Sequence, residues 1–109
     1  GANWVLMQKI VDPSGGPSDY FGYSVAIAGD HAMVGAIWDD IGSNTNQGSA
    51  TIYQKVGAGW QKMQYLADPA GNADQLFGAS LAMDNSTDRF AVGAVGYLGI
   101  GKVVFGKTN

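Results

Sequence analysis

The chain has 109 residues, a net charge of −3 and a charged fraction of only 14%. This composition excludes a basic surface for nucleic acid and a polybasic membrane patch, and no stretch approaches the ~20 apolar residues that a membrane-spanning helix needs. The sequence contains no cysteine, so neither disulfides nor thiolate metal sites contribute to it.

The sequence of the first 22 residues recurs later in the chain. Trp4 to Gly22 reads WVLMQKIVDPSGGPSDYFG, and Trp60 to Gly78 reads WQKMQYLADPAGNADQLFG, so Trp, Asp-Pro and Phe-Gly recur 56 positions apart. Such a period predicts a repeat architecture, in which one unit cannot bury its own apolar face. We expect a single repeat domain over 1–109, with residues 1–11 as an outer strand given to another blade. The repeats are then 12–67 and 68–109, and the second lacks its outer strand.

Strand periodicity follows the Phe-Gly pair in both copies. From Phe21 to Ile27 large side chains alternate with Gly22, Ser24 and Ala26, and residues 77–83 repeat the alternation. A period of two predicts a strand with one bulky face and one small face, packed closely on both. Phe21 and Phe77 are expected to be buried equivalents.

The remaining strands are separated by turn residues. Second strands are predicted at 32–36 and 90–94, third strands at 49–55 and 102–107, and a fourth at 60–66. Gly-Asp, Gly-Ala-Gly and Asp-Asn-Ser segments between them are typical of tight turns. The methionines at strand positions, Met7 included, are expected to fill the core. No window shows the spacing of an amphipathic helix.

Four strands per repeat are the layout of a β-propeller blade. The segments DYFGYSVAIAGDHAMVGA and QLFGASLAMDNSTDRFAVGA resemble FG-GAP repeats, as in integrin-like and bacterial surface proteins. The resemblance implies an all-β fold of two four-stranded propeller blades and an extracellular or cell-surface location. The residues that mark the repeat are Trp4, Trp60, Phe21, Gly22, Phe77, Gly78, Gly35, Ala36, Gly93 and Ala94.

The order of the strands predicts self-association. The chain begins with a spare outer strand, Trp4 to Val11, and ends on a third strand, Lys102 to Lys107. Two blades do not close a propeller, which typically has 4–8. We therefore expect a homo-oligomer or filament in which each copy lends its first strand to the next.

Hard oxygen donors gather in the loop between the second and third strands of the first copy. Asp39, Asp40 and Asn44 are candidate calcium ligands, but the loop lacks the D-x-[DN]-x-[DN]-G spacing that presents alternating side chains to one ion. The matching stretch of the second copy, 95–100, has no carboxylate. We expect no cofactor, and calcium remains the alternative to a solvated polar turn.

Aromatic residues suggest a second ligand. Trp38 and Tyr97 each follow the Gly-Ala of a second strand, and an aromatic ring beside Asp39 and Asp40 can stack on a sugar while the carboxylates bind its hydroxyls. Some FG-GAP propellers resemble this in binding glycans between blades. The loop itself is expected to be dispensable for the strand ladder.

Catalytic residues are sparse. His31 is the only histidine, and Ser24 and Ser80 lie on the small face of a packed strand. No second histidine or cysteine completes a zinc site or a Cys-His pair. The sequence predicts a non-enzymatic extracellular scaffold or adhesion module that assembles by strand exchange. The alternative is a lectin-like carbohydrate binder. Besides a second copy, the expected partner is a glycan or a cell-surface protein.

Overall fold

The structure is a computed structural model that describes residues 5–11, 19–84, 86, 88–96 and 101–108. It confirms the all-β fold: the described residues contain strands and turns and no helix. The strands are β1 (Phe21–Ala28), β2 (His31–Ala36), β3 (Ser49–Val56), β4 (Gly59–Leu66), β5 (Phe77–Asp84), β6 (Arg89–Ala94) and β7 (Lys102–Lys107).

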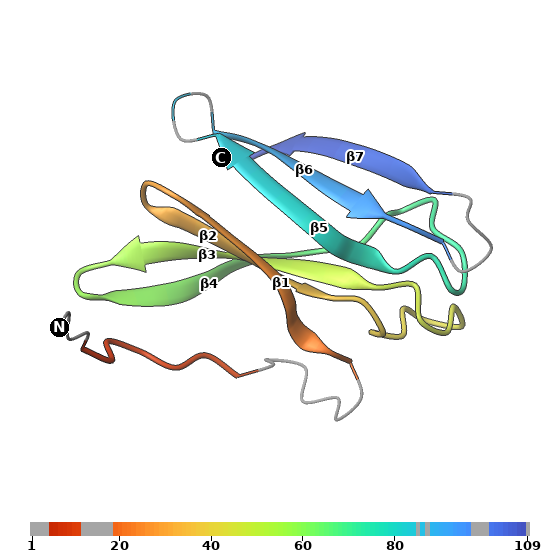
Figure 1. Cartoon of the computed structure of the whole chain (residues 1–109), viewed down its shortest axis with the longest axis horizontal. Coiled ribbons are helices and arrows are strands. Elements are labelled where there is room, and N and C mark those ends of the chain that lie inside the picture. Colours follow the sequence, from red (N-terminus) through yellow and green to blue (C-terminus); the bar gives the residue numbers. More distant parts are fainter. Residues whose placement is uncertain (1–4, 12–18, 85, 87, 97–100, 109) are drawn as a thin grey trace, which may run out of the picture.

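The strands form two antiparallel meanders. One sheet has the order β1-β2-β3-β4, and the other has the order β5-β6-β7. Figure 1 shows them as two layers, with β5 crossing close to β1 where the sheets meet. Sequential strands pair throughout because each is followed by a tight turn. The two sheets match two propeller blades, the second with three strands.

The two sheets repeat each other in register. In the first sheet Val25 pairs with Val34 and Val34 with Thr51, and in the second Leu81 pairs with Val92 and Val92 with Val104. Positions therefore correspond at offsets of 56, 58 and 53 residues in the first, second and third strands. Both first strands carry the same register shift three residues after their phenylalanine.

The backbone at the Phe-Gly pair explains this shift. Gly22 and Gly78 have φ of 93° and 100°, a conformation that residues with a Cβ rarely adopt. Tyr20 and Leu76, two residues earlier, also share a positive φ of 58° and 59°. At Gly78 a Cβ would lie 2.5 Å from the Ser49 carbonyl oxygen, so glycine also permits the second sheet to approach the first.

The core lies between the two sheets. Its buried members come from β2, β3, β5 and β6, namely Met33, Ala50, Ile52, Phe77, Phe90, Val92 and Ala94. Partly buried Leu81 and Met83 pack against it from β5. The Ser24 hydroxyl donates a hydrogen bond of 2.5 Å to the Gly78 carbonyl and links the first strands of the two sheets. The small face of β1 is thus covered by the bulky face of β5.

One equivalent cross-strand pair contains an aromatic residue in both sheets, but on different strands. The cross-strand pair Ala32 and Tyr53 in the first sheet corresponds to Phe90 and Gly106 in the second. A Cβ on Gly106 would overlap the Phe90 ring, so the ring on one strand requires a glycine on its neighbour. The large residue has changed strands, and the volume of the pair is roughly kept.

The bulky face of β1 differs from the sequence prediction. Packing on both faces was expected, but Tyr23, Val25 and Ile27 are 57%, 68% and 70% exposed. Phe77 is buried at 2% exposure, whereas its equivalent Phe21 is only half-buried, so the prediction of two buried equivalents is wrong for Phe21. The reason is topological: the first sheet covers β5, and no described residues cover β1 in the same way.

The segment before the first sheet forms no strand in its described part, residues 5–11. Gln8 fixes it to the start of β4, since its side-chain amide accepts from the Trp60 amide at 2.7 Å and donates to the Trp60 carbonyl at 3.0 Å. Val5, Leu6, Met7 and Val11 are exposed and Ile10 is half-buried, so Met7, at 73% exposure, is not the core residue expected from the sequence. Trp60 is half-buried, and Trp4 lies outside the described residues.

Candidate functional site

The loop between β2 and β3, residues 37–48, joins the two sheets. Its carbonyl oxygens at Thr45, Asn46 and Gln47 accept hydrogen bonds from the amides of Asp74, Leu76 and Phe77, at 2.7, 3.2 and 2.8 Å. Gly48 and Phe77 form a parallel bridge at the end of this run. The expectation that the loop is dispensable is wrong, because its backbone continues the pairing from the first sheet into the second.

One buried and one half-buried amide side chain reinforce this joint. Gln47 is 1% exposed and donates to the Asp68 carbonyl at 2.9 Å. Asn44 donates to the Gln47 side-chain oxygen at 2.8 Å and to the Gly71 carbonyl at 3.1 Å. Because buried amides are costly when unpaired, this network fixes the loop against the segment that leads into β5.

Asp39 has a structural position. Its carboxylate is buried and accepts hydrogen bonds from the Ser49 hydroxyl at 2.7 Å and from the Tyr65 hydroxyl. Burial, followed by the hydrogen bond to Asp39, raises the pKa of Tyr65 to about 12. Asp39 therefore ties the start of β3 to β4.

The three candidate calcium ligands have separate partners. Asp40 is exposed and accepts from the Asn46 amide at 2.8 Å, while Asp39 and Asn44 bind the groups described above. Among the described residues no group of three or more histidine, cysteine, aspartate or glutamate side chains is placed to hold a metal ion. Asp39, Asp40 and Asn44 therefore each serve a different hydrogen bond of the loop.

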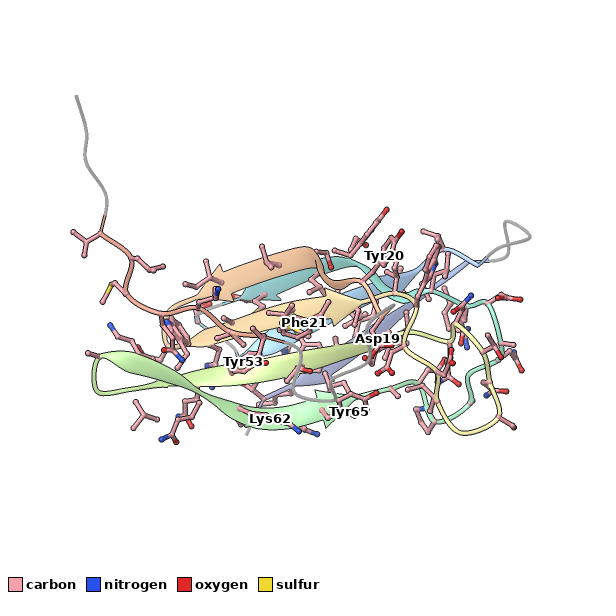
Figure 2. All side chains as sticks on the ribbon, turned by 90° about the horizontal axis from the view of Figure 1, so that it is seen from below. Asp19, Tyr20, Phe21, Tyr53, Lys62 and Tyr65 are labelled. Atoms are coloured by element: carbon pink, nitrogen blue, oxygen red, sulfur yellow. The ribbon has the colours of Figure 1, made fainter. Side chains whose placement is uncertain are left out.

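Trp38 forms an aromatic pair with a residue that the sequence did not single out. Its ring stacks on Tyr20 with centroids 4.2 Å apart and an interplanar angle of 28°. The Trp38 amide also donates to the Asp19 carbonyl at 3.1 Å. Tyr20 is exposed and projects from the molecule in Figure 2, so it is the accessible ring of the pair. Tyr97, the other predicted aromatic, lies outside the described residues.

An ion pair in the second sheet was also missed. Lys102 lies 2.6 Å from the Asp68 carboxylate, whose side chain is 8% exposed. The hydrogen bond from Lys102 lowers the pKa of Asp68, against the opposing effect of burial. The other Asp68 oxygen accepts from the Ala70 amide at 2.9 Å, which closes the turn after Asp68-Pro69. Only the repeated Asp-Pro signalled this position in the sequence.

The residues considered for catalysis have separate positions and do not form a catalytic arrangement. Ser24 donates to the Gly78 carbonyl, His31 begins β2, and Ser80 lies on the outer face of β5. An open hollow lies elsewhere, lined by Arg89, Phe90, Phe105, Gly106 and Lys107. No helix in the described part of the chain is long and apolar enough to cross a membrane.

Comparison with protein families agrees with this geometry. The model of the FG-GAP repeat matches residues 4–53, a span that runs from Trp4 through most of β3. Residues 4–53 are an FG-GAP repeat. Searches among curated proteins and among solved structures gave no match.

The FG-GAP repeat match over residues 4–53 suggests a β-propeller-type module. Such repeats are generally non-enzymatic and typically occur in extracellular or surface proteins. The second sheet reproduces the register, the shift and the positive φ of the matched repeat, which gives the chain two blades of one design. Fold alone does not assign a function, so function is argued from the exposed edges and faces.

Proposed function

We propose that this chain is a non-enzymatic extracellular scaffold or adhesion module that builds a larger β-propeller or polymer by strand exchange. The observation that supports it is the edge of the second sheet. β7 is the last strand of that sheet, whereas its equivalent β3 has β4 as a further neighbour. An edge strand presents unpaired backbone groups to another chain.

The segment that fits this edge is residues 5–11. Its sequence corresponds to that of β4, and Leu6, Met7 and Val11 are exposed in the isolated chain. The β3–β4 register, including Ala50 opposite Leu66, then transfers to an intermolecular pair. Val103 of one copy lies opposite Ile10 of the next, and the shift between Ile52 and Tyr53 recurs at Met7.

Deletion of residues 1–11 tests strand exchange directly. Light scattering should show the intact chain as an oligomer of about two to four copies if the blades close into a propeller, or as longer species if they do not. The deletion variant should lose the intermolecular strand pair and therefore associate more weakly than the intact chain. Gln8→Ala is the control, since it removes only the link to Trp60 and keeps the apolar segment. A well-folded monomer of the intact chain at high concentration would defeat the proposal.

Cysteine cross-linking tests the register, because the natural chain has no cysteine. Ile10→Cys with Val103→Cys should form a disulfide between chains, and Ala50→Cys with Leu66→Cys should form the equivalent bond within a chain. Ile10→Cys with Phe105→Cys is shifted by two residues and should cross-link poorly. If the cysteines introduced at positions 10 and 103 formed their bond within one chain, the result would contradict exchange.

Carbohydrate binding is the second candidate function. It is favoured by the stacked pair of Tyr20 and Trp38, with the exposed Asp40 two residues after Trp38 in the chain. An accessible ring beside a carboxylate suits a sugar. Tyr20→Ala should abolish binding on a glycan array without affecting assembly, since Tyr20 is exposed. An array without signal for the intact chain, with and without calcium, would remove this candidate.

A further inference from the structure

We propose that the outer face of the second sheet is a docking surface for the outer face of the first sheet of a second copy. The receiving surface is the small face of β5 with its neighbours, and the incoming surface is the bulky face of β1. The proposal rests on the proposed function in that the partner is again a second copy. It concerns the faces of the sheets and not their edges.

The contact between the two sheets within one chain is the template. There, the bulky face of β5 packs across the small face of β1 and the Met33 side of β2, and it reaches β3. Since the register of the second sheet matches that of the first, the second sheet presents the same small face on its outer side. The first sheet presents the bulky face of β1 on its own outer side, whereas Thr51 and Tyr53 of β3, which are in register with that face, are buried.

On both outer surfaces, exposed residues have equivalents that are buried or half-buried in the contact between the two sheets of one chain. On the receiving side Phe105 is 80% exposed, whereas its equivalent Ile52 is fully buried in the internal contact. On the incoming side Val25 and Ile27 are exposed, whereas their equivalents Leu81 and Met83 pack against the core. Large apolar side chains exposed on a continuous sheet face mark an interaction site.

A specific polar contact transfers as well. Within the chain, the Ser24 hydroxyl and Gly35 receive the Gly78 carbonyl, and a Cβ on Gly35 would overlap that oxygen. Ser80 and Gly93 are paired in the second sheet as Ser24 and Gly35 are in the first.

At Gly93 a Cβ would overlap the Ser80 hydroxyl but would meet no carbonyl of another sheet. The incoming Gly22 has the same backbone conformation as Gly78, and a Cβ there would meet nothing within 4 Å. In the complex, the Ser80 hydroxyl donates to the Gly22 carbonyl of the second copy.

The two surfaces differ, so the contact is head to tail. A head-to-tail contact leaves one bulky face and one small face free at the ends, and each added copy extends the stack until a ring closes. A second copy is the occupant that the structure supports, because the incoming surface repeats one that already fits the equivalent face inside the chain.

Two charged variants block one surface each. Ala82→Arg lies on the exposed small face of β5, and Val25→Asp lies on the exposed bulky face of β1. Each should keep the thermal stability of the monomer and weaken self-association by about a hundredfold or more, since each buries an unpaired charge in the contact. Ala58→Arg, in the exposed turn between β3 and β4, is the control and should associate normally.

Mixing the two blocked variants tests the direction of the contact. In chains that lack residues 1–11, which cannot exchange strands, each variant retains one intact surface, so an equimolar mixture should form a one-to-one heterodimer in sedimentation velocity. Self-association of Ala82→Arg alone would indicate pairing of two bulky faces, and self-association of Val25→Asp alone would indicate pairing of two small faces. Either result, or a mixture that stays monomeric, would overturn the proposal.

The serine pair provides a finer test. Ser80→Ala should weaken association about fivefold, the usual effect of losing one hydrogen bond, without lowering monomer stability. Ser24→Ala should lower monomer stability without a comparable effect on association. The opposite pattern would show that Ser80 is not in the contact.

Failure of docking and failure of strand exchange can be told apart. The heterodimer of blocked variants can be formed with both chains lacking residues 1–11. If the heterodimer forms without residues 1–11, the docking proposal is supported, and strand exchange only increases the affinity. If cross-linking at positions 10 and 103 succeeds while the blocked variants still associate by themselves, strand exchange stands and docking is refuted.

Discussion

The two sheets share a register and differ in what covers them. Phe77, Leu81 and Val92 lie against the first sheet, whereas the equivalent Phe21, Val25 and Val34 have no such neighbour and are more exposed. The same backbone design thus gives a core on one side and an open surface on the other. Burial in this chain is decided by position in the stack of sheets and not by the residues of the strand alone.

The third strands differ in a second way. Ser49 begins β3 and donates to Asp39, whereas the equivalent Lys102 begins β7 and pairs with Asp68. Both residues hold a nearby acid at the same end of the sheet. A hydrogen bond from a neutral hydroxyl to a carboxylate in one blade therefore corresponds to an ion pair in the other.

The largest expected contrast is between the two phenylalanines. Phe77→Ala should lower the free energy of unfolding by about 3–5 kcal/mol, because it leaves a cavity in the core. Phe21→Ala should cost less than half of that in the monomer, since its ring is already partly in water. Urea denaturation at low protein concentration measures both, and equal losses would show that Phe21 is as well covered as Phe77.

Substitution of Gly22 and of Gly78 distinguishes the cost of backbone strain from the cost of steric overlap. Gly22→Ala and Gly78→Ala both place a Cβ at positive φ, at a cost of about 1–3 kcal/mol each. Gly78→Ala also forces the Cβ against the Ser49 carbonyl oxygen, which should add about 1–3 kcal/mol. Both variants are compared by the same denaturation. If Gly22→Ala lowered the free energy of unfolding as much as Gly78→Ala, the space beside Gly22 would not be open.

The ion pair of the second blade should give an acid-dependent stability. The folded pKa of Asp68 lies below its ordinary value of 3.8, so its contribution is complete above pH 3.8 and is lost as pH falls through the folded pKa. Asp68→Asn should lower the urea midpoint at pH 7 and flatten the fall in stability below pH 3.8.

Ser49→Ala is the matched control for this comparison, because it removes the equivalent contact of the first blade without removing a carboxylate. It should lower stability without removing the acid dependence that comes from the pair of Asp68 and Lys102. An Asp68→Asn variant with the same acid dependence as the natural chain would show that the Lys102 pair does not influence folding.

The smallest effect concerns Tyr65. Its pKa is raised from 10.0 to about 12, so the stability that it contributes is complete below pH 10 and is lost as pH rises toward 12. The effect on stability is small because Tyr65 is 40% exposed. Ultraviolet titration should show a late-ionising tyrosine that Tyr65→Phe removes. Asp39→Asn should lower the pKa of Tyr65 only in part, since burial is the larger cause.

Strand positions were predictable from the sequence because a period of two and tight turns are local signals. Every predicted strand from 21 onward is present within a residue or two of its expected bounds. The joint formed by Gln47 with Asn44 and Asp68 was not predictable, since these residues come together only when the two sheets pack. Trp38 was identified, but its partner Tyr20 was not, because neither spacing nor repetition links them.

The sequence by itself determined the two-blade repeat, the Phe-Gly turns and the alternation of bulky and small side chains, all of which depend on neighbours in the chain. Only the tertiary structure decided which of the repeated faces is buried. Equivalent residues such as Ile52 and Phe105 have the same local pattern, yet one is enclosed and the other lies in solvent. The physical reason is that burial depends on which sheet lies across the face, and that is a property of the assembled sheets.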